Sequence, residues 1–101
     1  MRRMPSWKKL LRRMVADRNP KSYTYDEAAG ILEQLLFDPP RNPSGSHRKF
    51  RRGIADPAAP SGERGVIIGL VDAGSGKMNP EYIKQMVQTL RDNGLLPPDC
   101  E

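Results

Sequence analysis

Prolines and glycines divide this chain into short segments, and so they limit the length of every helix and strand it can form. The 101 residues include 10 prolines and 9 glycines, and both residue types mark turns and loops. A chain of this size is expected to form one small domain with a modest core. We therefore expect short elements, well-marked loops and a shallow functional site.

No apolar segment of the sequence approaches the roughly 20 residues that span a bilayer. Residues 1–9 are basic, and the apolar run that follows is short and is interrupted by Arg12 and Arg13. A secretory signal has a longer, uncharged apolar run. We expect a cytoplasmic protein that does not associate with a membrane.

The first predicted helix begins after Ser6, whose side chain can cap a helix N-terminus. Asn19-Pro20 disfavours helix beyond about Asp17. Apolar side chains recur at helical spacing between these limits and form one stripe, made of Trp7, Leu10, Leu11, Met14 and Val15. The stripe favours docking on the rest of the domain, although a basic amphipathic helix also suits a membrane surface or a groove in a partner.

The second predicted helix starts with a capping box. Thr24 and Glu27 have the spacing at which each side chain can bond the backbone N–H of the other residue. Asp38-Pro39-Pro40 lies beyond the end of this helix. Four apolar residues at helical spacing are expected to form its buried face: Ala28, Ile31, Leu32 and Leu35.

The last predicted helix has signals at both ends. Asn79 suits the N-cap and Pro80 suits the first helical position. Gly94 is placed for a left-handed C-terminal cap, with Leu95 or Leu96 packing back on the helix. The expected buried stripe consists of Tyr82 or Ile83, followed by Met86, Val87 and Leu90.

Strand-forming segments lie between these two helices. Residues 65–71 form a nearly continuous apolar run, which predicts a strand covered on both faces. One cover is the helical layer, and the other is either the first helix or a protein partner. Residues 46–52 predict a second strand, residues 40–44 allow only a short or irregular one, and residues 53–65 are expected to be a long flexible connection.

The order of these elements predicts an α+β fold. Two helices flank the strand-forming segments, and an additional helix precedes them. A small antiparallel sheet with two helices on one face fits that order.

Positive charge is concentrated in the first half of the chain. Residues 1–52 hold 13 Lys/Arg and 5 Asp/Glu, a net charge of +8, whereas residues 53–101 hold 4 Lys/Arg and 7 Asp/Glu, a net charge of −3. A localised positive field attracts polyanions, of which nucleic acid is the commonest. The alternative is a charged surface that only keeps the protein in solution.

His47 is the single histidine of the chain. Side chains alternate between the two faces of a strand, so a strand that buries Phe50 also directs Arg48 and Arg52 toward the core side. Three side chains then share the opposite face: His47, Lys49 and Arg51. That face is suited to holding a phosphodiester beside an imidazole.

The sequence offers no obvious metal site. Cys100 is the single cysteine, so it cannot form an internal disulfide, and one histidine with one cysteine cannot make a protein-only zinc site. No carboxylates have a suggestive spacing. We expect chemistry that uses neither a metal ion nor a small-molecule cofactor.

Metal-free RNA cleavage needs a base for the 2′-hydroxyl and positive charge for the phosphate. Histidine exchanges protons near neutral pH, and cations from Lys49, Arg48 or Arg51 can stabilise the charged transition state. Gly45 and Ser46 let the backbone approach a phosphate, and the Ser46 hydroxyl can add a hydrogen bond. An ordinary surface histidine in a basic strand is the alternative interpretation.

The segment Gly45-Ser46-His47-x-x-Phe50 resembles the signature of HicA toxins, small bacterial endoribonucleases. The similarity extends over residues 23–96. It includes the capped helix before the motif and the apolar strand after it. It also includes two later segments, Asn79-Pro80-Glu81-Tyr82-Ile83-Lys84 and Leu90-Arg91-Asp92-Asn93-Gly94-Leu95.

The resemblance implies a fold like the double-stranded-RNA-binding domain, with three strands between two helices. It implies metal-independent cleavage of mRNA with His47 essential, and a cognate HicB-like antitoxin that covers the active site. The toxin domain would comprise residues 23–96, after an N-terminal helix and linker in residues 1–22 and before a tail in residues 97–101.

The group that works opposite His47 is left open by the sequence. Many HicA proteins have a second histidine after the third strand, whereas this chain reads Gly69-Leu70-Val71-Asp72 there. Lys49 or a water molecule could take that role.

Lys77 is a further candidate for RNA contact. It ends Gly74-Ser75-Gly76-Lys77, which only superficially looks like a phosphate-binding P-loop. The full pattern needs a glycine where Val71 stands and Ser or Thr where Met78 stands. A plain turn that carries Lys77 toward RNA is the better interpretation.

Two other functions remain open at this point. One is a non-catalytic RNA-binding module of the same fold, because duplex RNA is recognised mainly through its shape and phosphates. The other is a protein-interaction module that works through the helix containing Trp7.

Overall fold

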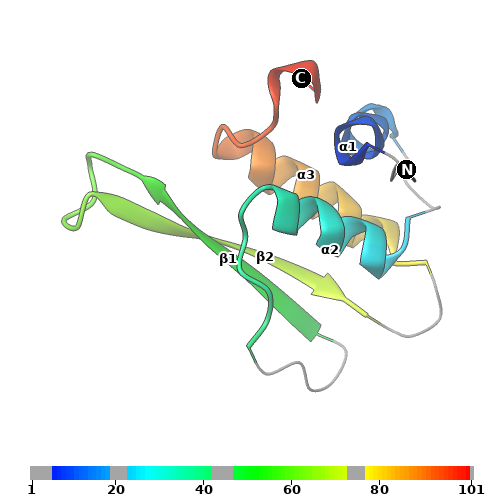
Figure 1. Ribbon diagram of the computed structural model, residues 1–101, viewed down its shortest axis with the longest axis horizontal. Coiled ribbons are helices and arrows are strands. Elements are labelled where there is room, and N and C mark those ends of the chain that lie inside the picture. Colours follow the sequence, from blue (N-terminus) through cyan, green and yellow to red (C-terminus); the bar gives the residue numbers. More distant parts are fainter. Residues whose placement is uncertain (1–5, 19–22, 42–46, 73–76, 101) are drawn as a thin grey trace, which may run out of the picture.

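The computed structural model describes residues 6–18, 23–41, 47–72 and 77–100. Their arrangement is α+β, as predicted, with three α-helices and a two-stranded antiparallel sheet. Helices α2 and α3 lie side by side on one face of the sheet, and α1 lies on the far side of these two helices (Figure 1). The elements in chain order are α1 (Trp7–Ala16), α2 (Tyr25–Gln34), β1 (His47–Ala55), β2 (Glu63–Val71), α3 (Pro80–Asp92) and the short 3₁₀ helix η1 (Pro98–Cys100).

Helix α1 docks on the domain through its apolar stripe, as expected. The Ser6 side chain accepts a hydrogen bond from the Lys9 backbone N–H at 3.4 Å and caps the helix. Leu11 and Met14 are buried in the common core, and the helix packs against α2, α3 and η1. Helix α1 therefore does not cover the outer face of the sheet, the face turned away from α2 and α3. The first helix was one of the two covers expected for that face.

The two helices that cover the sheet have the predicted caps. Thr24 and Glu27 form the complete capping box, with the Thr24 backbone N–H donating to Glu27 Oε1 at 2.9 Å. Asn79 Oδ1 accepts from the Glu81 backbone N–H at 2.9 Å. The predicted α2 face is buried, and in α3 the buried stripe begins at Ile83 rather than Tyr82.

The end of α3 follows the predicted left-handed pattern. Gly94 has a φ of +67°, a conformation in which glycine has no Cβ to clash. The Leu95 backbone N–H then returns to the Leu90 carbonyl oxygen at 2.8 Å. Leu96 is the residue buried after this turn, whereas Leu95 is only partly buried.

The sheet is a longer hairpin than the sequence indicates. The register pairs Phe50 with Ile68 and continues outward to Ala55 and Glu63. The expectation of a flexible connection over residues 53–65 is therefore wrong at both of its ends, since only residues 56–62 form the turn. The Asp56 backbone N–H donates to the Gly62 carbonyl oxygen at 2.8 Å and closes that turn.

The predicted short or irregular strand at residues 40–44 falls partly outside the described residues. Within them, Asp38 forms an isolated antiparallel bridge with Arg51, through backbone hydrogen bonds of 2.7 and 3.2 Å. Pro39 and Pro40 follow immediately and have no N–H to donate to β1. The described residues thus form a two-stranded sheet, and Asp38 adds a single-residue bridge to its β1 edge.

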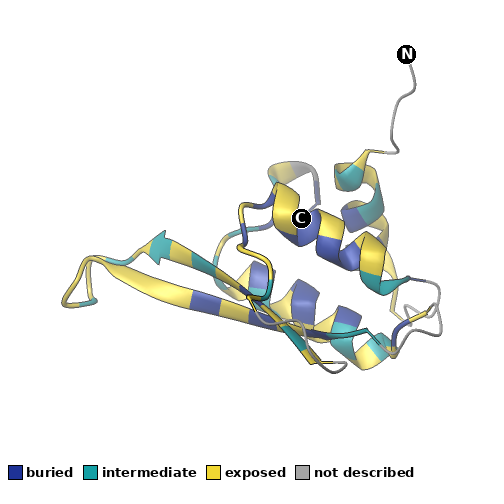
Figure 2. Cartoon of the chain, turned by 60° about the horizontal axis from the view of Figure 1, so that its bottom comes forward, coloured by how far each residue is buried: buried dark blue, intermediate teal, exposed yellow. Residues whose placement is uncertain are grey.

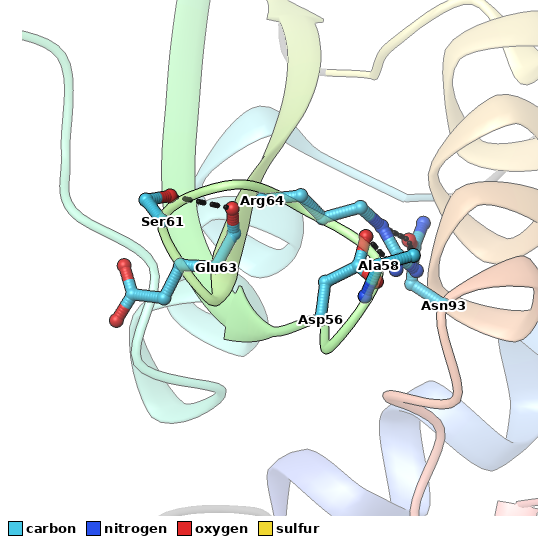
Figure 3. A network of polar contacts seen from close by, with 6 residues as sticks. All are labelled: Asp56, Ala58, Ser61, Glu63, Arg64 and Asn93. Carbon is cyan, nitrogen blue, oxygen red and sulfur yellow. Dashed lines mark hydrogen bonds and ion pairs between the residues drawn. The ribbon is translucent and has the colours of Figure 1, made fainter.

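The outer end of the hairpin extends well beyond the helices as an arm (Figures 1 and 2). Arg64 ties this arm to the body. Its guanidinium donates to Asn93 Oδ1 at 2.6 and 3.2 Å and to Asp56 Oδ2 at 3.1 Å, so it joins the turn, β2 and the end of α3 (Figure 3). The arm is therefore held in one direction relative to α3.

The segment expected to be a tail, residues 97–101, packs on α1 where the structure describes it. Helix η1 contacts α1, and Cys100 is buried there. The Cys100 thiol donates a hydrogen bond to the Lys8 carbonyl oxygen at 3.6 Å. Among the described residues, no helix has the length and apolar character needed to cross a membrane.

Candidate functional site

Strand β1 divides its side chains between two faces, as predicted. Phe50 points into the core and is only 1 % exposed. Three side chains are exposed on the opposite face of the strand: His47, Lys49 and Arg51. The structure therefore brings three of the predicted site residues together along one row, on the side of the sheet away from the helices.

These three side chains line an open hollow of about 600 Å³. A second wall comes from the segment that follows α2. The lining residues are His47, Lys49 and Arg51 from β1, with Asp38, Pro39, Pro40 and Arg41 from that segment. The hollow lies between two parts of the chain that the sequence separates.

Two contacts hold the second wall against β1. The backbone bridge between Asp38 and Arg51 is the first. In the second, Arg52 reaches back on the core side and donates from Nη1 to the Leu35 carbonyl oxygen at 2.9 Å. Neighbouring residues of β1 therefore fix both the end of α2 and the wall of the hollow.

The chain turns sharply from α2 into this wall. Leu36 adopts a φ of +69°, which an L-residue with a side chain rarely does. The Phe37 backbone N–H bonds the Leu32 carbonyl oxygen at 2.9 Å, and the Phe37 ring is buried. Pro39-Pro40 then continues the wall with restricted backbone angles. The turn therefore brings Arg41 into the lining of the hollow.

The charge lining the hollow is mainly positive. Arg41, Lys49 and Arg51 contribute three cations, and Asp38 contributes one carboxylate. An imidazole among cations is suited to a phosphodiester, because the cations attract the phosphate and the imidazole can move a proton. The arrangement can support proton transfer at a bound phosphate.

Arg48 lies on the other face of β1 and does not line the hollow. Its Nη2 is 3.8 Å from Asp72 Oδ2, and its guanidinium lies 6.0 Å from the centroid of the Tyr25 ring. The Tyr25 ring packs against the Phe50 ring at 6.3 Å between centroids. Burial raises the pKa of Tyr25, although the Arg48 charge opposes that rise. Arg48 therefore joins α2 to β1 beneath the hollow.

Three other predicted site residues remain, and the structure describes one of them. Gly45 and Ser46 lie outside the described residues. Lys77 is exposed and pairs with Thr24 in an isolated bridge, which connects the start of α2 to the segment before α3. Lys77 does not line the hollow.

Sequence reasoning missed the wall formed by residues 38–41. The signal that could have found it is the pair Pro39-Pro40, because a rigid segment directly after a helix brings whatever follows it to a fixed place. Arg41 is the missed residue most suited to contact a phosphate, since it adds a cation to the hollow that His47 also lines.

In the ranges that the structure describes, no group of three or more histidine, cysteine or carboxylate side chains is placed to hold a metal ion.

Comparison with known proteins found no matching protein-family model, no similar curated protein and no similar solved structure.

Proposed function

We propose that this protein is a HicA-type toxin, a metal-independent endoribonuclease that cleaves mRNA at the hollow beside His47. The observation that carries the proposal is the row His47, Lys49 and Arg51, which lines an open hollow together with Arg41. The motif at residues 45–50 supplies the resemblance, and the hollow supplies a place for the chemistry.

The arrangement of the elements supports the finer fold assignment as well. Helix α2, the bridging segment at Asp38, β1, β2 and α3 follow one another in the order of a double-stranded-RNA-binding domain. Both helices lie on the same face of the sheet (Figure 1). In this proposal the segment that begins at Asp38 corresponds to the first of three strands.

The proposed reaction is an internal transfer at phosphorus. The His47 imidazole takes the proton of the 2′-hydroxyl, the 2′-oxygen bonds to phosphorus, and the bond from phosphorus to the 5′-oxygen breaks. One product ends in a 2′,3′-cyclic phosphate and the other in a 5′-hydroxyl. Lys49 and Arg51 stabilise the additional charge on the phosphoryl oxygens.

The departing 5′-oxygen needs a proton from a second group. Lys49 is the nearest candidate along the strand, because it follows His47 on the same face. A water molecule in the open hollow is the alternative source. No described helix covers this face of the sheet. In this proposal a cognate HicB-like antitoxin binds over it and blocks RNA.

The test is the variant His47→Ala, with Lys84→Ala as a control that removes an exposed side chain of α3 away from the hollow. We expect His47→Ala to abolish both growth arrest and RNA cleavage while its circular dichroism spectrum stays that of the native protein. Undiminished cleavage by this variant would remove His47 from catalysis. Salt-sensitive RNA binding by the native protein without any cleavage product would instead support the non-catalytic RNA-binding module.

A further inference from the structure

The outer face of the sheet continues past the hollow onto β2. The register places Lys49 opposite Gly69 and Arg51 opposite Ile67. Residues directly opposite each other in an antiparallel pair have their Cβ positions about 4.5–5.5 Å apart. The cations that line the hollow therefore have an uncharged surface of β2 as their immediate neighbour.

Ile67 is an unusual residue on this surface. Its neighbours in the alternation of β2, Val66 and Ile68, are buried, whereas Ile67 is 51 % exposed on the face away from the helices. Gly65 and Gly69 flank it on the same face, and a Cβ placed on either glycine would meet nothing within 4 Å. Ile67 is thus an exposed apolar side chain with open space over the glycine on either side of it, and the cations of β1 lie beside it.

We propose that this surface, made of Ile67 and Gly69, holds an unpaired nucleobase of single-stranded RNA next to the phosphate bound by Lys49 and Arg51. The inference rests on the proposed function, since it extends the RNA site from the hollow. A base is flat and apolar on its faces, so it can lie over Gly69 against the side of Ile67. The phosphates on either side of that base carry the charge that the cations of β1 attract.

The proposed chemistry requires unpaired RNA at this place. Attack by the 2′-oxygen must come in line with the departing 5′-oxygen, and the regular A-form helix does not present that geometry. An unpaired nucleotide exposes the faces of its base, which proteins commonly cover with a flat or apolar surface. The surface beside the hollow provides such a cover.

Helix α2 is less suited to duplex RNA than the sheet face is. Helix α2 has the sequence YDEAAGILEQ, with three carboxylates and no lysine or arginine. Asp26, Glu27 and Glu33 are exposed on it. Carboxylates repel the phosphates of a duplex lying along α2, so between α2 and the sheet face the charges favour the sheet face for RNA.

The experiment measures binding in the His47→Ala background, so that cleavage does not consume the probe. Three fluorescein-labelled probes of about 10 nucleotides, a length within the site sizes of single-strand-binding folds, are compared by fluorescence anisotropy. They are a single-stranded RNA, the same strand in a duplex, and a strand of equal length and charge that lacks its bases. We expect the single strand to bind roughly tenfold more tightly than either other probe, as loss of a stacked base implies.

Two variants locate the base. Ile67→Thr keeps a β-branched residue and reduces the apolar surface. Gly69→Thr places a side chain in the open space over Gly69, and threonine is a good strand former. Each is expected to weaken single-strand binding by about fivefold, the lower range for loss of one base contact, and to leave binding of the baseless strand unchanged. Ile54→Thr is the matched control, because it makes the same substitution on the opposite face of the hairpin.

The proposal is overturned if the baseless strand binds as tightly as the normal strand, or if neither variant changes single-strand affinity. It is also overturned if Ile54→Thr has the same effect as Ile67→Thr. The proposed nuclease function fails by a separate result, the absence of any cleavage product when the native protein is incubated with RNA. The two proposals can therefore fail independently.

Discussion

The two faces of the hairpin formed by β1 and β2 contrast sharply. The inner face buries Phe50, Ile68 and Leu70 against α2 and α3, and each is at most 3 % exposed. The outer face carries His47 and Lys49, and both are exposed. Exposed and buried residues alternate along the hairpin (Figure 2). Packing determines which residues can occupy the inner face, whereas no described helix of the chain packs on the outer one. The outer face is therefore where residues can change for function without cost to the core.

The largest expected effect of breaking this contrast is on the inner face. Phe50→Ala removes a fully buried ring that also contacts Tyr25, and such substitutions lower the free energy of unfolding by about 3–5 kcal/mol. Urea denaturation followed by circular dichroism measures the loss. A loss under about 1 kcal/mol, the usual average for point mutants, would show that the inner face does not carry the core as described.

The outer face should respond in the opposite way. Lys49→Ala removes a cation from the hollow, so RNA cleavage should fall by roughly tenfold or more, while the free energy of unfolding stays within about 0.5 kcal/mol of the native value. Cleavage rates on a labelled RNA and urea denaturation are measured on the same preparation. Lys84→Ala is the matched control and should change neither quantity. Equal losses of cleavage in both variants would mean that general positive charge, and not the hollow, attracts the RNA.

Arg48 sharpens the comparison because it belongs to the same strand but to the inner face. Arg48→Met keeps the apolar stem and removes both the charge facing Asp72 and the contact with the Tyr25 ring. We expect the free energy of unfolding to fall by about 0.5–1 kcal/mol and RNA affinity at low salt to change less than in Lys49→Ala. A larger loss of RNA affinity than in Lys49→Ala would place Arg48 in direct contact with RNA.

The smallest expected effect is a pH dependence on the inner side. Burial raises the pKa of Tyr25 above its ordinary 10.0, so the folded state holds this proton more tightly than the unfolded state. The contribution to stability is complete below about pH 10 and is lost as the pH rises from there through the folded pKa. Tyr25→Phe should remove this part of the alkaline decline in denaturation curves. An unchanged decline in the variant would assign it to other groups, among them Tyr23, whose pKa burial also raises.

Much of this molecule could be predicted from local signals. The capping box at Thr24, the N-cap at Asn79 and the left-handed cap at Gly94 each depend on residues within one or two turns of a helix. The assignment of His47, Lys49 and Arg51 to one face needed only the alternation of a strand around Phe50. These features are local, and local sequence patterns determine them.

The features that sequence reasoning missed depend on contacts between distant segments. The hairpin arm is held by Arg64 and Asn93, which are far apart in the chain, so the glycines at residues 53 and 65 looked like parts of a flexible connection (Figure 3). The wall of the hollow depends on the bridge between Asp38 and Arg51. Packing of η1 on α1 joins the two ends of the described chain. No periodicity within a single segment reports such pairings.

The most direct test of the central claim is the chemistry of the RNA ends produced in the presence of EDTA. We expect the native protein to yield 2′,3′-cyclic phosphate and 5′-hydroxyl ends at an undiminished rate in EDTA, and His47→Ala to yield no products. Loss of cleavage on chelation, or 5′-phosphate ends, would contradict proton transfer by His47 at the hollow.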